Sequence, residues 1–202
     1  MKKVYAMLFM LAVPVFAGAS EAVEKRTLTP YVSFRFGGGI MSVGEERDIG
    51  GASFGFAVGL ERALTDNMAV RVEAESSFNR FEGVAERNIR GTPEMFEVIH
   101  VPRTYMANAY LDFLTDRRLR PYIGFGVGAM SQSEGIEAQS DGFLPFKVFD
   151  LGVAVGLYAG VGFNLTSSGN FIGDVGVRHV VSSFVGADVS MTNFNFGWRR
   201  VF

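Results

Sequence analysis

The 202-residue chain contains no cysteine, which excludes disulfide bonds and cysteine-ligated metal sites and fits a compartment where free thiols are oxidised. Charged residues make up 20% of the chain and the formal net charge is −2, so there is no electrostatic basis for binding nucleic acid. Beyond the N-terminal segment, no uninterrupted apolar run approaches the roughly 20 residues that a membrane-spanning helix needs. Glycine and phenylalanine are abundant instead, with 25 and 20 copies.

The N-terminal segment has the three parts of an export signal. Lys2 and Lys3 form a basic start, residues 4–16 are uncharged and apolar, and Ala17-Gly18-Ala19 offers a small-residue cleavage site. The apolar part is too short to cross the roughly 30 Å hydrocarbon core of a bilayer, and it contains a proline. We therefore predict a cleaved signal peptide over residues 1–19 and an exported domain over residues 20–202.

The last ten residues, 193–202, alternate with a period of two, as a β-strand with two unlike faces does. One face is small or polar. The other face is largely aromatic and consists of Phe194, Phe196, Trp198, Arg200 and Phe202. Lipid can cover such a face, but an unpaired strand edge in hydrocarbon costs several kcal/mol for each free backbone group. The pattern therefore predicts that this strand pairs with the first strand and closes a barrel.

Seven earlier segments share this alternation. The predicted strands cover residues 30–40, 52–61, 68–79, 103–113, 122–130, 148–163, 171–181 and 193–202. Long polar segments at residues 42–51, 80–102, 131–146 and 182–191 alternate with short turns, as expected when short turns face the periplasm and long loops face outside. The predicted fold is all-β: an eight-stranded antiparallel up-and-down transmembrane β-barrel.

Charged side chains occupy the inward-facing positions of these strands. Such charges suit the lumen, the interior of a small barrel, where opposite charges satisfy one another. The predicted lumen network consists of Arg35, Glu61, Arg71, Glu73, Glu75, Asp112, Asp174, Arg178 and Arg199, and Asp150 lies in the same register. We expect Arg71, Arg178 or both to pair with an inward carboxylate, chiefly Glu73, Glu75 or Asp174. An eight-stranded barrel is narrow enough for these side chains to fill, so the network is interpreted as a polar filling.

Several segments resemble a known family. MANAYLDF followed by PYIGFGVGAM, over residues 106–130, is similar to the fourth and fifth strands of the opacity-protein-type surface antigens, which are related to the OmpA membrane domain. YVSFRFGGGI and AGVGFNLT resemble the first and sixth strands of that family. The resemblance implies the outer membrane of a Gram-negative-type bacterium, periplasmic chaperones, and a C-terminal signal for the barrel-insertion machinery. That signal falls on Phe196, Trp198 and Phe202, whereas Arg200 departs from the family ending.

No residue pattern favours catalysis or a cofactor. His100 falls in a predicted loop without a second ligand at zinc-binding spacing, so neither a metal nor another cofactor is expected. His179 faces outward, and Ser183 is a serine on the same face that could act as a lipid-directed nucleophile. Glu73 and Glu75 resemble a glycosidase pair in composition only, because a narrow lumen would bury them. The glycine-rich run at residues 124–128 lies within a strand and precedes no helix.

Three functional hypotheses follow. The first is a non-enzymatic outer-membrane barrel that displays four surface loops for envelope structure, adhesion or antigenic display. The second is a small channel, and the third is a lipid-modifying enzyme. The expected partners are outer-membrane lipid, the insertion machinery with its chaperones, and a host or surface ligand of the loops.

Overall fold

The computed structural model describes most of the chain from Leu28 to the C-terminus. The described residues are 28–43, 49–89, 92–114, 118–137, 147–148, 151–167, 169–184 and 187–202. The predicted signal peptide and Asp150 lie outside these ranges. In the described part of the chain, no helix is long and apolar enough to cross a membrane.

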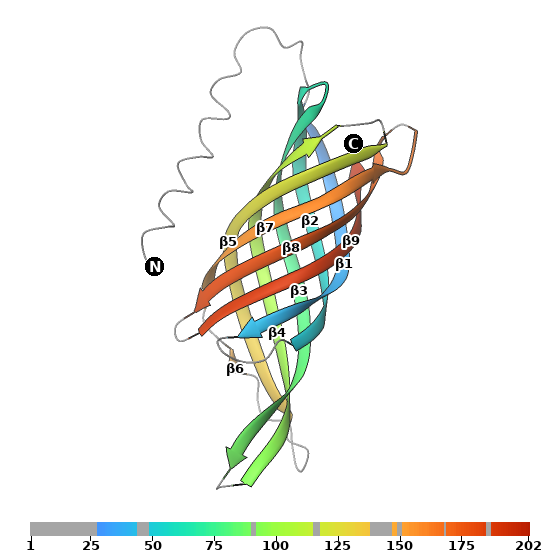
Figure 1. The fold of residues 1–202 in the computed structure, drawn as a ribbon. Coiled ribbons are helices and arrows are strands. Elements are labelled where there is room, and N and C mark those ends of the chain that lie inside the picture. Colours follow the sequence, from blue (N-terminus) through green and yellow to red (C-terminus); the bar gives the residue numbers. More distant parts are fainter. Residues whose placement is uncertain are drawn as a thin grey trace.

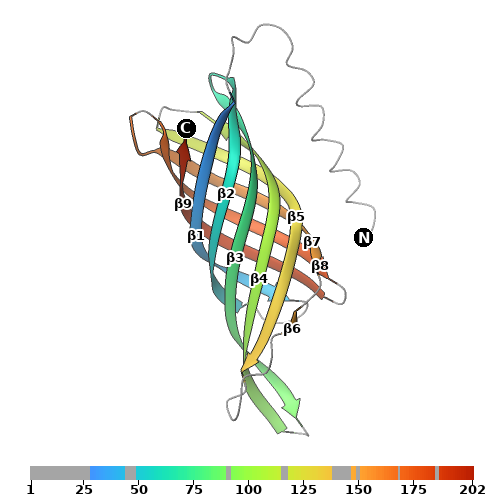
Figure 2. The same cartoon turned by 180° about the vertical axis from the view of Figure 1, so that it is seen from behind.

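Eight long antiparallel strands form one closed barrel, as predicted (Figures 1 and 2). The strands are β1 (Thr29–Val43), β2 (Ile49–Thr65), β3 (Met68–Ile89), β4 (Thr92–Phe113), β5 (Leu119–Glu137), β6 (Lys147–Val148), β7 (Gly152–Asn164), β8 (Phe171–Phe184) and β9 (Ala187–Val201). Each long strand pairs with its neighbours in the chain, and β1 pairs with β9 to close the cylinder. The two-residue strand β6 adds only a short pairing to β5.

The closing pair β1–β9 is held on its outer side by aromatic side chains. Phe34 lies opposite Trp198 and Phe36 lies opposite Phe196 in the register. The Phe34 and Trp198 rings are stacked with centroids 5.4 Å apart, and the Phe36 and Phe196 centroids are 6.3 Å apart. Such cross-strand aromatic pairs stabilise a sheet, so the C-terminal alternation supplies both the closure and part of its stabilisation.

Large apolar side chains are exposed all around the outside of the barrel. They come from outward positions on every long strand, and include Phe36, Phe54, Val72, Tyr105, Ile123, Leu157, Val177, Phe194 and Phe196. An exposed apolar surface of this extent is unfavourable in water, whereas hydrocarbon covers it without cost. The predicted alternation of lipid-facing and lumen-facing residues is therefore observed.

The largest correction concerns residues 80–102, which the sequence assigned to a loop. Strands β3 and β4 each continue to 22 residues and pair as far as Ile89 and Thr92. Figures 1 and 2 show this hairpin extending well beyond the other strands, at the end opposite the start of β1 and the C-terminus. We name the two ends of the barrel the terminal end and the loop end. Outside a membrane a strand needs no apolar face, so polar composition was a misleading sign of a loop.

Three smaller corrections concern strand bounds, and the first two have the same cause. Strand β5 continues through the predicted loop at residues 131–146 as far as Glu137, and β8 and β9 reduce the predicted loop at residues 182–191 to a short connection. The predicted sixth strand is divided into β6 and β7. Strands are thus longer than the expected ten residues because they extend past the apolar belt.

Candidate functional site

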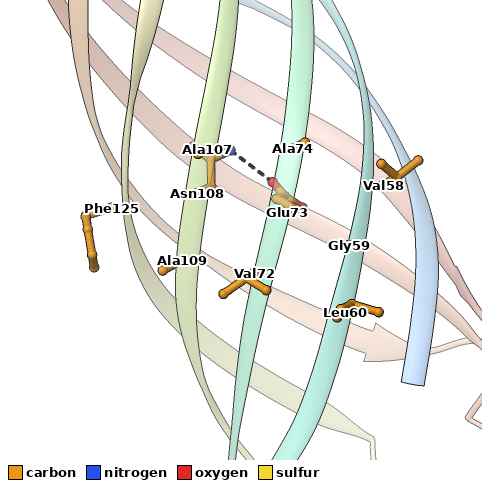
Figure 3. A pocket seen from close by; sticks show the side chains of 10 residues that line it. All are labelled: Val58, Gly59, Leu60, Val72, Glu73, Ala74, Ala107, Asn108, Ala109 and Phe125. Carbon is orange, nitrogen blue, oxygen red and sulfur yellow. Dashed lines mark hydrogen bonds between the residues drawn. The ribbon is translucent and has the colours of Figure 1, made fainter. Parts of the chain in front are cut away.

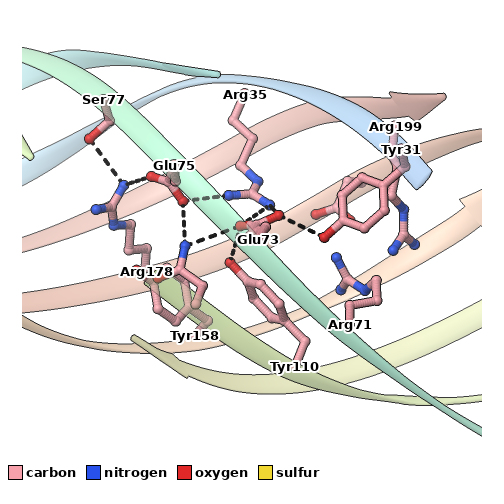
Figure 4. A network of polar contacts seen from close by, with 12 residues as sticks. Tyr31, Arg35, Arg71, Glu73, Glu75, Ser77, Tyr110, Tyr158, Arg178 and Arg199 are labelled. Atoms are coloured by element: carbon pink, nitrogen blue, oxygen red, sulfur yellow. Dashed lines mark hydrogen bonds and ion pairs between the residues drawn. The ribbon is translucent and has the colours of Figure 1, made fainter. Parts of the chain in front are cut away.

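The lumen is filled by side chains in three layers. A central polar group surrounds Glu73 and Glu75, a chain of ion pairs lies toward the terminal end, and an apolar cluster lies toward the loop end. Figure 4 shows the central group, with Arg71 and Arg199 of the terminal end beside Tyr31. Each layer is built from inward positions of several strands, so only barrel closure brings its members together.

Glu73 is the acceptor at the centre of the lumen. Its carboxylate accepts hydrogen bonds from Arg35 Nη2 at 2.8 Å, Tyr110 Oη at 2.6 Å and Tyr31 Oη at 3.0 Å. Asn108 Nδ2 donates a fourth bond to it at 3.1 Å. The side chain has no exposed surface, so its charge depends entirely on these donors.

Glu75 joins two arginines that lie on different sides of the lumen. Arg35 Nη1 donates to its carboxylate at 2.7 Å, and Arg178 forms a short ion pair with it. Arg178 also donates to Ser77 Oγ at 3.1 Å and to Thr104 Oγ1 at 2.9 Å. These contacts connect β1, β3, β4 and β8 across the barrel. Figure 4 shows Glu75 between Arg35 and Arg178.

Inward glycines provide the space for the lumen tyrosines. A Cβ atom at Gly59 would lie 2.5 Å from Cζ of Tyr31, and one at Gly160 would lie 2.5 Å from Oη of Tyr122. Any larger residue at these positions would displace the ring. The abundance of glycine thus reflects the packing of large polar side chains in a narrow barrel.

At the terminal end, five charged residues form an alternating chain. Arg120 donates to Glu61 at 2.9 Å, and Arg199 donates to Glu61 at 3.3 Å and to Asp112 at 3.5 Å. Arg71 Nε then donates to Asp112 at 2.8 Å. We call this set the terminal-end chain: Arg120, Glu61, Arg199, Asp112 and Arg71.

Both arginines pair with an inward carboxylate as predicted, but only Arg178 has one of the expected chief partners. Arg178 pairs with Glu75 as expected, but the carboxylate paired with Arg71 is Asp112. In the register of β3 and β4, Arg71 lies opposite Tyr110, so Asp112 is a diagonal neighbour on the next strand. Asp174 accepts a 2.6 Å bond from Tyr122 Oη, not the predicted arginine contact.

Arg120 is absent from the sequence-predicted set because it lay in a segment assigned to a turn. It belongs to β5, two residues before Tyr122 and on the same inward face. Extending the period of two by one step would have identified it. With Arg120, the described lumen holds five arginines and five carboxylates: Arg35, Arg71, Arg120, Arg178 and Arg199, and Glu61, Glu73, Glu75, Asp112 and Asp174.

The loop end of the lumen holds an apolar cluster that sequence reasoning did not identify. Its buried members are Met41, Phe81, Met106, Met130, Ala154, Val180, Val189 and Met191. Val43, Ile49 and Phe184 pack against it. The four methionines fit an irregular interior because their side chains are unbranched and flexible. The period of two in the sequence places the members of this cluster on the inward faces of their strands. Apolar side chains inside a polar lumen were nevertheless not expected.

The prediction that His100 lies in a loop is wrong. His100 is on β4 opposite Phe81 of β3, and its side chain is buried. Gln132 Nε2 lies 2.7 Å from the His100 Nδ1 atom, which gives the ring a partner inside the barrel. Among the described residues, no three His, Cys, Asp or Glu side chains are grouped so that they could hold a metal ion.

A shallow hollow of about 630 Å³ lies on the outer wall over β2 to β5 (Figure 3). The small residues Ala74, Ala107 and Ala109 form its floor between larger apolar side chains such as Leu60 and Phe125. Its opening belongs to the lipid-facing surface. Its lining is mostly apolar, as suits a surface that acyl chains would cover.

His179 lies on the outer face of β8, as predicted. Its Nδ1 atom is 2.9 Å from Thr192 Oγ1 on β9. Ser183, the predicted nucleophile candidate, is four positions along the same strand, which corresponds to roughly 13 Å. That separation does not permit the hydrogen bond that a nucleophile and its base require.

The C-terminal aromatic residues are exposed on the outer surface, from the middle of the closing pair to the terminal end. Phe196, Trp198 and Phe202 are 53%, 39% and 63% exposed. The backbone N–H of Phe202 donates to Pro30 O at 3.0 Å, which holds the last residue against the first strand. The residues of the predicted assembly signal therefore share one face of β9 and its end.

We expect Phe202→Ser to lower the amount of assembled protein in the outer membrane several-fold at native expression. The substitution removes the terminal aromatic residue that the insertion machinery is expected to read. Phe194→Ser is the matched control, because Phe194 is on the same face of the same strand and is 58% exposed. Immunoblots of heat-treated and untreated membranes would measure both variants, and equal loss in both would reject a specific terminal signal.

The closed barrel and its apolar outer belt define the class of protein: an eight-stranded outer-membrane β-barrel. The sequence matches no family model and no curated protein. Among solved structures, Neisserial surface protein A is similar with a TM-score of 0.58 at 18% identity, over 86% of this chain and 97% of that one. The fold implied by the resemblance to opacity-protein and OmpA-type barrels is thus confirmed.

Two further solved structures have lower scores. The attachment invasion locus protein Ail of Yersinia pestis, in complex with the heparin analogue sucrose octasulfate, has a TM-score of 0.44 at 14% identity, covering 84% of this chain and 98% of that one. The outer membrane enzyme PagL has a TM-score of 0.43 at 14% identity, with coverages of 84% and 98%.

Proposed function

We propose that the protein is a non-enzymatic outer-membrane barrel with a closed lumen, whose function is to display the β3–β4 hairpin and its neighbouring loops at the cell surface. The hairpin is the observation that carries this proposal. Its strands pair with each other for several residues past the last pairing of β2 with β3, at Gly50 and Glu82. β5 supports the β4 side of the hairpin as far as Glu137.

The filling of the lumen supports display over transport. The central group is crossed by ion pairs, and the apolar cluster at the loop end contains side chains that are almost completely buried. A hydrated ion would have to break buried charge pairs and then enter an apolar region, and both steps are costly. The filled lumen therefore supports a role for the surface at the loop end of the barrel and not transport through it.

The orientation that display requires can be tested with single cysteines, because the chain has none of its own. Val84 in the hairpin is 63% exposed, and Asp66 lies in the short turn at the terminal end. We expect Val84→Cys to react with a membrane-impermeant maleimide on intact cells. Asp66→Cys should react only after the outer membrane is permeabilised, and the reverse pattern would overturn surface display of the hairpin.

The two alternatives have their own observable consequences. Steady conductance of the folded barrel in planar bilayers would favour a channel. The contact between His179 and Thr192 is the one observation that favours a lipid-modifying enzyme. Mass spectrometry of membrane lipids from cells with and without the protein would reveal such an activity.

A further inference from the structure

Two arginines of the terminal-end chain have N–H groups that no described residue accepts. Arg71 and Arg199 are 1% and 2% exposed, yet Arg71 Nη2 and Arg199 Nε and Nη2 have no hydrogen-bond acceptor among the described residues. Buried polar groups are usually paired, and leaving a charged one unpaired is especially costly. The same region of the lumen therefore holds several buried donors that a ligand could satisfy.

The two guanidinium groups are close enough to share such a ligand. Both contact Asp112 Oδ2, Arg71 through Nε at 2.8 Å and Arg199 through Nη1 at 3.5 Å. Both also lie against the Tyr31 ring, with the Cζ atoms 6.0 and 5.4 Å from its centroid. Figure 4 shows the two groups beside Tyr31, whose hydroxyl group donates to Glu73 at 3.0 Å.

The charges of the terminal-end chain leave one positive charge in excess. Its cations are Arg71, Arg120 and Arg199, against the two carboxylates Glu61 and Asp112. Arginine does not lose its proton in proteins, so the excess persists at any ordinary pH. The other lumen charges, Arg35 and Arg178 against Glu73, Glu75 and Asp174, leave one negative charge in excess, so the described lumen as a whole is neutral. A bound anion would therefore act locally, by reducing the repulsion between the two guanidinium groups that share Asp112.

We propose that Arg71 and Arg199 form a binding site for a small monovalent anion of the chloride class. An anion only accepts hydrogen bonds, which matches a group of donors, whereas a water molecule brings two O–H donors of its own. Glu61 and Arg120 at the end of the chain retain 14% and 18% side-chain exposure, so the site is reached from the terminal end. The apolar cluster closes the route from the loop end.

Bromide provides a direct test with the native, refolded chain. In crystals grown in bromide, we expect an anomalous difference peak within hydrogen-bonding distance of Arg71 Nη2 and Arg199 Nη2. No peak between these groups, or peaks only at exposed guanidinium groups such as that of Arg80, would overturn the site. This map needs no variant, so it decides the matter even if the arginine variants do not fold.

Unfolding in detergent gives a second measurement. At equal ionic strength, chloride at ten times its dissociation constant should lower the unfolded-to-folded ratio about tenfold relative to a bulky anion such as gluconate. Arg199→Met should abolish this difference, whereas Arg80→Met, at an exposed surface pair, should retain it. Equal unfolding of the native chain in both salts, or an undiminished chloride effect in Arg199→Met, would contradict the proposal.

Discussion

Glu73→Ala is expected to destabilise the barrel by about 3–5 kcal/mol, the cost of breaking a buried charge pair by removing one partner. The substitution removes the acceptor of the Tyr31 and Tyr110 hydroxyl groups and one of the two carboxylates that hold Arg35. The tyrosine and arginine donors would remain inside the barrel without this acceptor, because turning them toward lipid would not bring them into contact with water. Urea unfolding in lipid vesicles, followed by the fluorescence of Trp198, the only tryptophan, would measure the change.

Glu82→Ala is the matched control for this prediction. Glu82 is also on β3 and also pairs with an arginine, Arg80, but both side chains are about half exposed or more. Surface ion pairs contribute about 0–1 kcal/mol, so Glu82→Ala should leave the unfolding midpoint nearly unchanged. Equal midpoints for Glu73→Ala and Glu82→Ala would show that the central group does not stabilise the fold.

Gly37→Val is expected to prevent closure of the barrel. A Cβ atom on Gly37 would overlap the backbone carbonyl of Phe194 on the neighbouring strand, and backbone atoms cannot move aside as a flexible side chain can. Overpacking costs about 1–3 kcal/mol or more, and here it acts on the β1–β9 pairing that removes the last open edges. We expect little or no protein with the faster migration of a folded barrel on unboiled gels.

Gly50→Val tests whether the effect is specific to the closing pair. Gly50 lies on β2 at the loop end, and a Cβ atom there would meet nothing within 4 Å. This variant should migrate like the native chain when unboiled and shift only after boiling. Normal heat-dependent migration of Gly37→Val would mean that the β1–β9 pairing adapts to the added side chain.

The sequence alone determined which face of each strand meets lipid and which meets the lumen. In an extended strand, alternate side chains point to opposite sides, so the local order of Phe34, Arg35 and Phe36 fixes their directions. An apolar outward face and an inward charge then imply a closed barrel, because neither fits an open sheet in hydrocarbon. The pairing of the last strand with the first followed from this argument and is observed.

The tertiary structure decided which inward groups meet. The stagger between strands places Arg71 beside Asp112, while Glu73 and Glu75 on its own strand bind Arg35. Alternation gives the direction of a side chain but not its height in the barrel, so these partners could not be read from one strand. The length of the β3–β4 hairpin was likewise set by pairing between segments beyond the apolar belt, where polar composition no longer distinguishes a strand from a loop.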